Sequence, residues 1–509
     1  MSKKKFGKNI ISKISALCIM LALCVNIMGL GSCGQDSGGK TDNPGAVSPD
    51  DPAAAEDTPE ETGPVGLPPN LPVNDMGGKE ITLGLTNWHN YNPLAIHDIE
   101  VEELTGEGIN DAAYNRNIFM EQTFNCAINT VAFPGSAEAL TRLRNQVKAG
   151  DDTLDIVFFR AIGMMPPLTE KLLHEFSDVP HVNLNNPWWN KSSIEAMSIG
   201  GRVYSLLGDY SMTVLSCVWL TYFNKDLMGD FGLENPYNHV KENKWTLNKM
   251  YEMGKIAAMD LNGDGKMGTI EDRVGFMHIN NTATALYNGF GERLVDIDAD
   301  GLPYISLEKP SAIEKFMHIA DILSDHDVFL NAHMRTNDAY IHEAGMFVRG
   351  QSLFSLGGVY YAPEMRAMEQ NFGLLPYPKY DEKQTEWFNP IHSAAIPLIT
   401  VPVTNGDLDN MGLFIEAFTY QGHTNVRPQF YDIMLQRKVA RDDESEEMLE
   451  FIFNNIFFDI GEAYDFAGIY GNFNIMACSN KTNIASWLEK NTVRIEREID
   501  KFIDAMVGE

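Results

Sequence analysis

The sequence predicts an α/β fold in which strands and helices alternate along the chain. Three short apolar runs, 79–88, 126–133 and 154–159, have the length and composition of strands. The segments between them, 111–125 and 135–150, place apolar residues at helical spacing. Strands separated by helices must cross over in the right-handed sense, which gives a parallel sheet with helices on both faces. Ligands of such sheets bind at the carboxyl ends of the strands.

The rest of the chain repeats this alternation less regularly. Further strands are predicted at 200–208, 214–227, 345–361, 371–379 and 393–402, with a hairpin at 293–309 and helices at 246–259, 442–461 and 484–506. Two lobes, each visited more than once by the chain, are the economical arrangement. The expected boundaries are 1–32 for a signal peptide, 33–76 for a disordered acidic tether, 77–212 plus 348–422 for the first lobe, and 213–347 plus 423–509 for the second.

The N-terminus has the pattern of a secretory signal. Five lysines in the first 13 residues precede an apolar run at 14–30, and Cys33 follows Gly31 and Ser32. The last four residues of this pattern resemble the bacterial lipoprotein box, in which the cysteine is lipidated and becomes the first residue of the mature protein. We therefore expect anchoring to the extracytoplasmic face of the cell membrane through Cys33, with 33–76, rich in Pro, Gly and acids, as a tether.

Composition excludes several classes of function. The formal net charge of −31 argues against a nucleic-acid partner. Only Cys126, Cys217 and Cys478 remain beyond the predicted signal and lipid site, and they are too few and too widely spaced for a disulfide framework. The chain contains no G-x-S-x-G or H-E-x-x-H motif.

The stretch "MDLNGDGKMGTIED" at 259–272 fits the EF-hand loop pattern without gaps. We expect one structural Ca²⁺, with no organic cofactor, held by Asp260, Asn262, Asp264, the Lys266 carbonyl, and Glu271 or Asp272. An Asx-rich turn without metal is the alternative. A second "DxDxDG" at 296–301 has Leu307 at its twelfth position, so a hairpin turn is favoured there.

Several segments, in their order along the chain, resemble the lipid-anchored solute-binding proteins of ABC importers, in the branch that includes maltose-type sugar binders. They include "AGDDTLDIVFF", "HVNLNNPWWN", "GGRVYSLLGD", "YFNKDLMGDFGL", "DLNGDGKMGTIEDRVGF" and "NFGLLPYPKYDEKQTEW". The resemblance implies a type II periplasmic-binding-protein fold, with parallel or mixed sheets flanked by helices and hinge strands between the lobes. It also implies a monomer that captures a carbohydrate and delivers it to a permease, without catalysis.

Sugars present apolar ring faces and a rim of hydroxyls, so a sugar site combines flat aromatic side chains with polar groups. Trp88, with Asn87 beside it, follows the first strand, and Arg160 ends the third, where a guanidinium must face water or a ligand. By position in the resemblance, further ligand contacts are expected from Asp209, Tyr210, Asn280, Asn281, Phe354, Tyr360, Tyr361 and Tyr464, with Phe466 as an alternative to Tyr464.

A surface-anchored glycoside hydrolase is the competing enzyme hypothesis. It too would be secreted, acidic, aromatic-rich and stabilised by calcium. It needs two carboxylates that flank one glycosidic bond. No acid in the sequence stands in a context that marks such a pair.

Overall fold

The computed structural model describes residues 66–86, 96–332, 345–365, 368–436, 443–479 and 483–508. Glu61–Glu509 group as one compact unit, and the account below concerns the described part of that unit. The signal segment, Cys33, Asn87 and Trp88 lie outside the described residues. No helix among the described residues is both long and apolar enough to cross a membrane.

The first sheet has four strands in the order β12-β3-β1-β2. β1 (Lys79–Thr86) is parallel to both β2 (Cys126–Phe133) and β3 (Ile156–Arg160), as the alternation of strands and helices predicts. β12 (Pro397–Thr400) joins β3 in the antiparallel sense from far along the chain. β1 and β3 are buried along most of their length, whereas β2 forms an edge with an exposed face.

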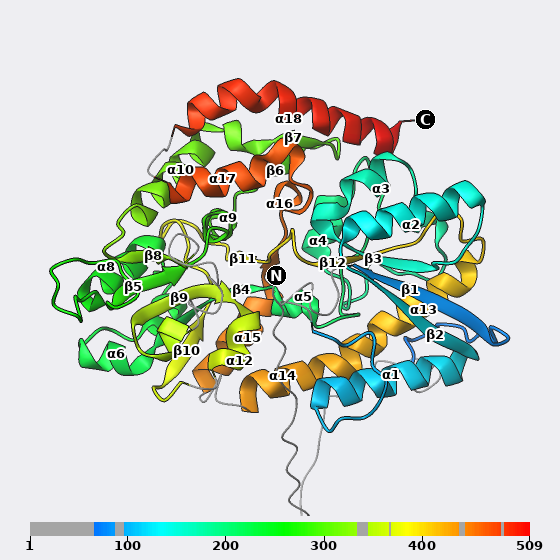
Figure 1. The fold of residues 1–509 in the computed structure, drawn as a ribbon, viewed down its shortest axis with the longest axis horizontal. Helices are drawn as coiled ribbons and strands as arrows, with labels where there is room; N and C mark the ends of the chain where they lie inside the picture. The colour runs from blue at the N-terminus through cyan, green and yellow to red at the C-terminus, as the bar shows by residue number, and fades with distance from the viewer. Residues whose placement is uncertain are drawn as a thin grey trace, which may run out of the picture. The chain divides into compact units, whose positions relative to one another are not determined.

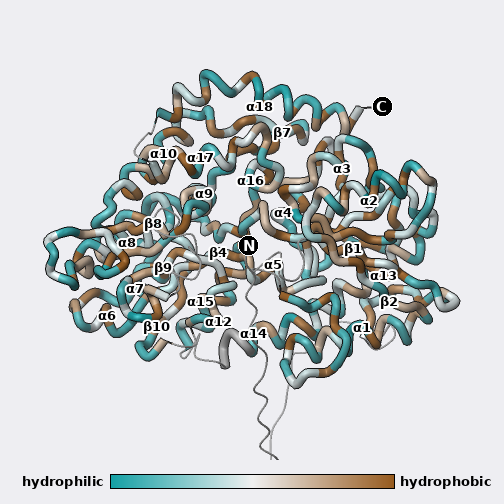
Figure 2. The backbone as a smooth tube through the Cα atoms, viewed as in Figure 1, coloured by the Kyte–Doolittle hydropathy of each residue, from teal (hydrophilic) through white to brown (hydrophobic). Residues whose placement is uncertain are grey.

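The second sheet has five strands in the order β10-β4-β9-β5-β8. β5 (Val274–His278) is parallel to β8 (Phe329–Asn331) and β9 (Ser352–Gly358). β4 (Trp219–Asn224) is antiparallel to β9 and to β10 (Phe372–Leu375). Figure 1 shows the two sheets on opposite sides of the molecule, and Figure 2 shows brown, hydrophobic strands in both.

Helices cover both sheets. The helices near the first sheet are α1 (Gly108–Phe124), α2 (Ser136–Ala149), α3 (Met165–Thr169), α4 (Lys191–Met197), α5 (Thr213–Ser216), α13 (Leu408–Gln421) and α14 (Arg427–Gln436). Those near the second are α6 (Lys225–Asp230), α7 (Pro236–Lys241), α8 (Leu247–Ala257), α9 (Thr282–Gly289), α10 (Pro310–Leu323), α12 (Ala362–Met365) and α15 (Asp443–Asn454). The chain ends with α16 (Ile460–Tyr464), α17 (Ile469–Cys478) and α18 (Ile484–Val507).

Three segments of chain run side by side between the two sheets, and we call them the crossing segments. The first, at 217–219, leads from α5 into β4, and Val218 bridges Ile391 of the second segment. The second includes β11 (Asn389–Pro390), which pairs in parallel with β13 (Ile456–Phe457) of the third. These are the strands between sheets that the predicted hinge requires.

The helix α18 packs against elements that belong to both sides. On one side it contacts α3, the helix that follows β3. On the other side it contacts β7 (Pro303–Ile305), which forms a hairpin with β6 (Val295–Ile297). Figure 1 shows α18 (red) lying across the top of the molecule above both sets of elements. The hairpin is the one predicted at 293–309, with its turn at Asp298–Gly301.

The expected lobe boundaries need two corrections. β9 and β10 pair in the second sheet, whereas the sequence places 348–422 in the first lobe. α14 packs on α1 at the first sheet, whereas the sequence places 423–509 in the second lobe. The strand-forming residues in these segments indicate a strand but not its partner, because either sheet can accept an apolar strand of this length.

The predicted tether is also too long at its C-terminal end. Leu67, Leu71 and Met76 are buried in the core, and the Met76 amide donates to the carbonyl of Phe124 at 2.7 Å. The prolines and glycines of this segment indicate a disordered chain, but its few leucines bury enough apolar surface to hold it in place.

Candidate functional site

The carboxyl ends of β3 and β5 lie beside the second crossing segment. Arg160 is the last residue of β3, and Asn280 and Asn281 follow β5 directly before α9. His392 comes from the second crossing segment, where its amide donates to the Cys217 carbonyl of the first at 2.9 Å. Two sheets and the second crossing segment therefore contribute polar side chains to one region.

His392 is the centre of this region. It is 4% exposed, and its Nε2 lies 3.3 Å from Nδ2 of Asn281 and 3.2 Å from the hydroxyl of Tyr470. Oε1 of Glu462 on α16 lies 3.8 Å from the same Nε2 atom. We define the His392 cluster as Arg160, Asn281, His392, Glu462 and Tyr470.

Burial controls the charges in the cluster. Burial, together with the positive charge of Arg160, lowers the pKa of His392 to about 3, so this imidazole is neutral at physiological pH. Because Nε2 faces an amide N–H and a hydroxyl, we assign Nε2 as the acceptor and the proton to Nδ1. Burial also raises the pKa of Glu462 well above its ordinary value, although backbone amides of Ser393 and Ala394 donate to this side chain.

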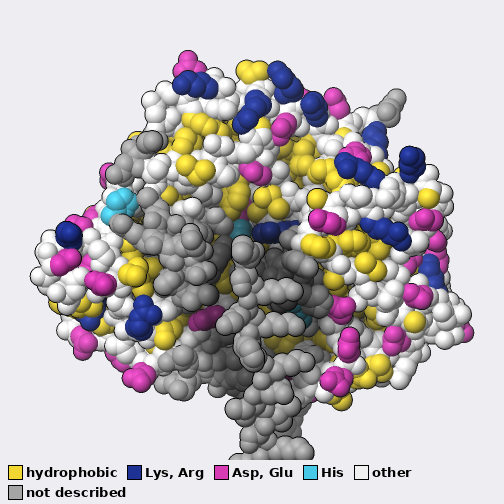
Figure 3. Space-filling model, in the orientation of Figure 1, with side chains coloured by type: hydrophobic (Ala, Val, Ile, Leu, Met, Phe, Trp, Pro, Cys, Tyr) yellow, Lys and Arg dark blue, Asp and Glu magenta, His cyan; other side chains and the backbone are white. Residues whose placement is uncertain are grey.

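Arg160 is the cationic member of the cluster. Its backbone amide donates to Oγ1 of Thr86 at 2.7 Å, which fixes the end of β3. Its side-chain Nε is buried without a hydrogen-bond partner, and within the described residues its guanidinium forms no ion pair. Figure 3 shows the face hollowed near its centre, where dark blue and cyan side chains adjoin.

Aromatic side chains border the cluster. The ring centroid of Trp219, in the first crossing segment, is 5.9 Å from that of His392 and 6.5 Å from that of Tyr360. Tyr360 is half-buried and packs edge-on against Tyr361, with ring centroids 4.6 Å apart. Oδ1 of Asn280 accepts a hydrogen bond of 2.8 Å from Nδ2 of Asn331. Of the expected residues that the structure describes, Arg160, Asn280, Asn281 and Tyr360 lie near this region.

Four other predicted ligand residues are buried among apolar side chains of the core. Tyr210 is fully buried and packs on Phe158, and Tyr361 is 2% exposed. Phe354 is fully buried in β9 and stacks on Phe276 with centroids 5.2 Å apart. Tyr464 is 5% exposed, as it packs between other rings that include the alternative residue, Phe466. Large aromatic side chains gain more from burial than from exposure, so strand position alone overestimates their availability.

Asp209, a predicted ligand residue, is bound by side chains of another element. Its Oδ2 accepts hydrogen bonds from Nδ1 of His423 at 2.6 Å and from Nη1 of Arg427 at 2.7 Å. His423 lies in a π-helical segment, Gly422–Val426, that joins α13 to α14. A Cβ at Gly422 would lie 2.0 Å from the Asp209 carbonyl oxygen, so glycine is required for this approach. Asp209 therefore ties two elements together.

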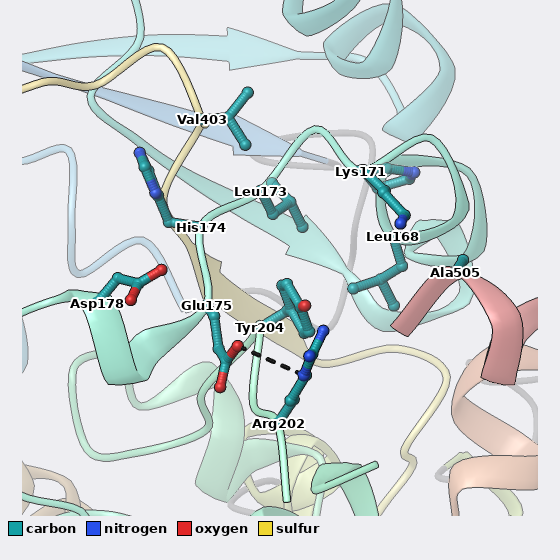
Figure 4. A pocket seen from close by; sticks show the side chains of 11 residues that line it. Leu168, Lys171, Leu173, His174, Glu175, Asp178, Arg202, Tyr204, Val403 and Ala505 are labelled. Atoms are coloured by element: carbon teal, nitrogen blue, oxygen red, sulfur yellow. Dashed lines mark ion pairs between the residues drawn. The ribbon is translucent and has the colours of Figure 1, made fainter. Parts of the chain in front are cut away.

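Two cavities lie near these elements. One of about 450 Å³ is bounded by Trp188, Asp209, Leu215, Arg427 and Ile456, among others. The other, of about 300 Å³, is shown in Figure 4, where Lys171 and Arg202 lie near Ala505 of α18 and an ion pair joins Arg202 to Glu175. The basic side chains of the second cavity bind the end of α18: Nζ of Lys171 donates to the Gly508 carbonyl, and Nη1 of Arg202 donates to that of Met506.

The predicted calcium loop connects α8 to β5. Asp260 accepts from the amides of Gly263 and Gly265, at 2.7 and 2.8 Å, and Glu271 accepts from Nδ2 of Asn262 at 2.9 Å. Asp264 similarly accepts from the Lys266 amide. Over the described ranges, no group of three or more His, Cys, Asp or Glu side chains is gathered for a metal ion.

Asp272, the alternative last ligand, is fully buried next to this loop. Its Oδ2 accepts from the amide and the hydroxyl of Thr269, at 3.0 and 2.7 Å. Asp272 thus stabilises the end of the loop, which leaves Glu271 as the residue exposed to solvent at the twelfth position.

Sequence reasoning missed His392, Glu462 and Tyr470. The sequence does mark His392 as a candidate, because this polar residue stands immediately before the strand-forming run "SAAIPLITVP", in the segment that leads into β12. Glu462 and Tyr470 carry no comparable signal, since they occur in helical segments with many acids and aromatics.

No protein-family model matches the chain, and no curated protein matches it. Solved structures with similar folds do exist. The maltose-binding periplasmic protein MalE from Listeria monocytogenes, in complex with maltose, matches with a TM-score of 0.54 at 15% identity, over 84% of this chain and 99% of that one. UspC of M. tuberculosis matches with a TM-score of 0.54 at 13% identity, over 82% and 100%. A sugar transporter protein from Rhizobium etli, in an open conformation, matches with a TM-score of 0.51 at 13% identity, over 84% and 98%.

These likenesses show that the chain has the two-lobed fold of periplasmic binding proteins, as the sequence predicts. The fold covers nearly the whole length of each neighbour. At this level of identity the likeness defines the fold alone, and the ligand must be argued from the site.

Proposed function

We propose that the protein is the solute-capturing subunit of an ABC importer, that it binds an oligosaccharide between its two lobes, and that it passes this ligand to a membrane permease. The observation that carries the proposal is the His392 cluster, in which polar side chains from both sheets meet at the crossing segments. The carboxyl ends of strands on both sides contribute, which is where open α/β sheets bind ligands. Half-buried Tyr360, whose ring packs on the buried Trp219, offers the apolar surface that a sugar ring needs.

The chemistry of the cluster suits binding better than catalysis. Glu462 accepts from the backbone amides of Ser393 and Ala394. The nearby Asp459 accepts from the Gly461 and Leu294 amides and from Asn288, and it caps α16. Both carboxyl groups are thus engaged in holding the chain, whereas a glycoside hydrolase needs two that face the scissile bond. We propose that the protein is not an enzyme.

The proposal is tested by isothermal titration of the full chain, purified in detergent, against oligosaccharides, amino acids and peptides. We expect saturable binding of an oligosaccharide with no product detected by chromatography after prolonged incubation. Binding of amino acids or peptides alone would contradict the carbohydrate assignment, and release of shortened sugars would favour the glycoside hydrolase.

The proposal also includes anchoring through a lipid on Cys33, at the extracytoplasmic face of the membrane, and a monomeric state. A diacylated cysteine would hold the protein on the membrane surface, because two acyl chains give stable anchoring. We expect Cys33→Ser to abolish the mass increase due to lipid and to release the protein from membranes. Retention of the variant in the membrane fraction would contradict this anchor.

A structural Ca²⁺ in the loop at 259–272 is the last part of the proposal. The ion would be held by Asp260, Asn262, Asp264, the Lys266 carbonyl and Glu271, which supply the oxygen ligands that Ca²⁺ prefers. The amide bonds to Asp260 and the positive φ of Gly265, 76°, are compatible with a loop wrapped around an ion. The loop would then secure the end of α8 to the start of β5.

Metal analysis and thermal unfolding test this site. We expect about one Ca²⁺ per chain and a lower Tm after chelation, and we expect Asp260→Asn to lose the ion. Asp298→Asn, in the hairpin turn whose pattern lacks the twelfth acid, is the matched control and should leave the metal content unchanged. A chain that retains the same Tm and metal content after chelation would exclude the site.

A further inference from the structure

We infer that the solute carries a carboxylate, as an acidic oligosaccharide does, and that Arg160 is the residue that selects it. This inference rests on the proposed function and narrows its substrate class.

The first argument is the missing partner of Arg160. Its Nε is buried with no acceptor, and none of the ion pairs formed by the described residues includes it. By contrast, the half-buried Arg427 and Arg293 each contact an aspartate within 3.3 Å. A buried guanidinium N–H without an acceptor costs free energy unless the bound solute supplies the acceptor.

The second argument is the chemistry around it. His392 is neutral, and the Nδ1 atom to which we assign its proton is also buried without a partner. The cluster therefore contains two buried donors without an acceptor, one of them charged. Glu462 accepts from backbone amides, burial raises the pKa of its carboxyl group, and none of the ion pairs among the described residues joins it to Arg160.

The third argument is the position of α9. This helix begins at Thr282, and its preceding residue, Asn281, contacts His392. The amino end of a helix carries a partial positive charge, which adds to that of Arg160. A neutral sugar would supply hydroxyl acceptors but would leave both charges uncompensated, whereas a carboxylate can accept two parallel N–H bonds from a guanidinium.

The test compares acidic oligosaccharides with their methyl esters, which have the same rings and no charge. Isothermal titration of the full chain would use oligomers of galacturonate, glucuronate and alginate, each paired with its ester, together with neutral maltotriose. We expect at least one acidic oligomer to bind about 30-fold more tightly than its ester, and the difference to shrink as salt is added.

Variants then assign the effect to Arg160. Arg160→Gln should lose about 30-fold in affinity for the acid and less than about threefold for the ester, while Arg160→Lys should retain an intermediate preference. The Tm of Arg160→Gln should not fall, because the variant removes an unpaired charge. Arg202→Gln, outside the cluster, is the matched control and should keep the full preference.

The possible outcomes distinguish this inference from the proposed function. If neutral oligosaccharides bind as well as or better than every acidic one, the inference is wrong and solute capture stands. If Arg160→Gln retains the preference for the acid, Arg160 is not the selecting residue. If no saccharide of either kind binds, the proposed function itself is wrong.

Discussion

The ionic contact between Asp209 and Arg427 allows a sharp prediction about stability. The sequence assigns Asp209 to the ligand site, whereas the structure pairs it with His423 and Arg427. The side chain of Asp209 is 9% exposed and that of Arg427 is 20% exposed, so water screens the pair only weakly. Asp209→Asn keeps the size of the side chain and removes its charge, which leaves Arg427 without a carboxylate.

The expected cost follows from this burial. Removing one partner of a buried ion pair costs about 3 to 5 kcal/mol, because the remaining charge is left uncompensated. Arg427 keeps a hydrogen bond of 3.1 Å to the Tyr431 hydroxyl and some contact with solvent, which favours the lower end, about 3 kcal/mol. At about 2 °C for each kcal/mol in a chain of this size, Tm should fall by about 6 °C.

Differential scanning fluorimetry of the variants measures this effect. Asp230→Asn, which changes an exposed carboxylate, is the control and should shift Tm by no more than about 1 °C. The double variant Asp209→Asn with Arg427→Met should recover part of the loss, because it removes the unpaired charge as well. Ligand affinity should stay within about threefold of the wild type. An unchanged Tm combined with lost binding would refute the structural role and restore the assignment to the ligand site.

Two further predictions concern the cluster and the C-terminal helix. The pKa of His392 is about 3 in the folded protein and about 6.5 in the unfolded chain, so only the unfolded chain binds a proton between these pH values. The free energy of unfolding should therefore decrease as pH falls from about 6.5 towards 3, by up to about 1.4 kcal/mol per pH unit. Urea unfolding of His392→Gln should show a smaller loss over this window, and an identical pH profile would contradict the prediction. Replacing both Lys171 and Arg202 by Ala removes two donors to the last carbonyls of α18, so hydrogen exchange at the end of α18 should accelerate and stability should fall by about 1 to 2 kcal/mol. Lys490→Ala, on the exposed face of α18, should change neither, and equal exchange in both variants would contradict the role of these contacts.

Local patterns explain the parts of the fold that the sequence predicted well. The parallel pairing of β1 with β2 and β3 follows from the helices between them, and the helix α8 begins after Thr246, whose hydroxyl accepts from the Lys249 amide as a cap. The hairpin of β6 and β7 follows from its Asp-Gly turn. These features depend on residues close together in the chain, so their signal is contained in short stretches of sequence.

The site was only partly predictable because it depends on residues distant in sequence. Arg160 and Asn281 stand after strands, so topology alone places them near a cleft. His392 joins them only through the bonds of its segment to Cys217, 175 residues earlier by number, and Glu462 and Tyr470 only through the packing of α16 and α17. Aromatic residues gave the least reliable predictions, because core and ligand site both favour large flat side chains.

By itself the sequence determined the acidic character of the chain, the α/β class and the order of its main elements, since charge, periodicity and turn chemistry act locally. Only the tertiary structure decided which sheet receives β9 and β10, that Asp209 pairs with Arg427, and that Nε of Arg160 is buried without a hydrogen-bond partner among the described residues. The physical reason is that burial and ion pairing depend on which distant segments meet, and the free energy of a charge depends on the partner and the solvent that it finds there.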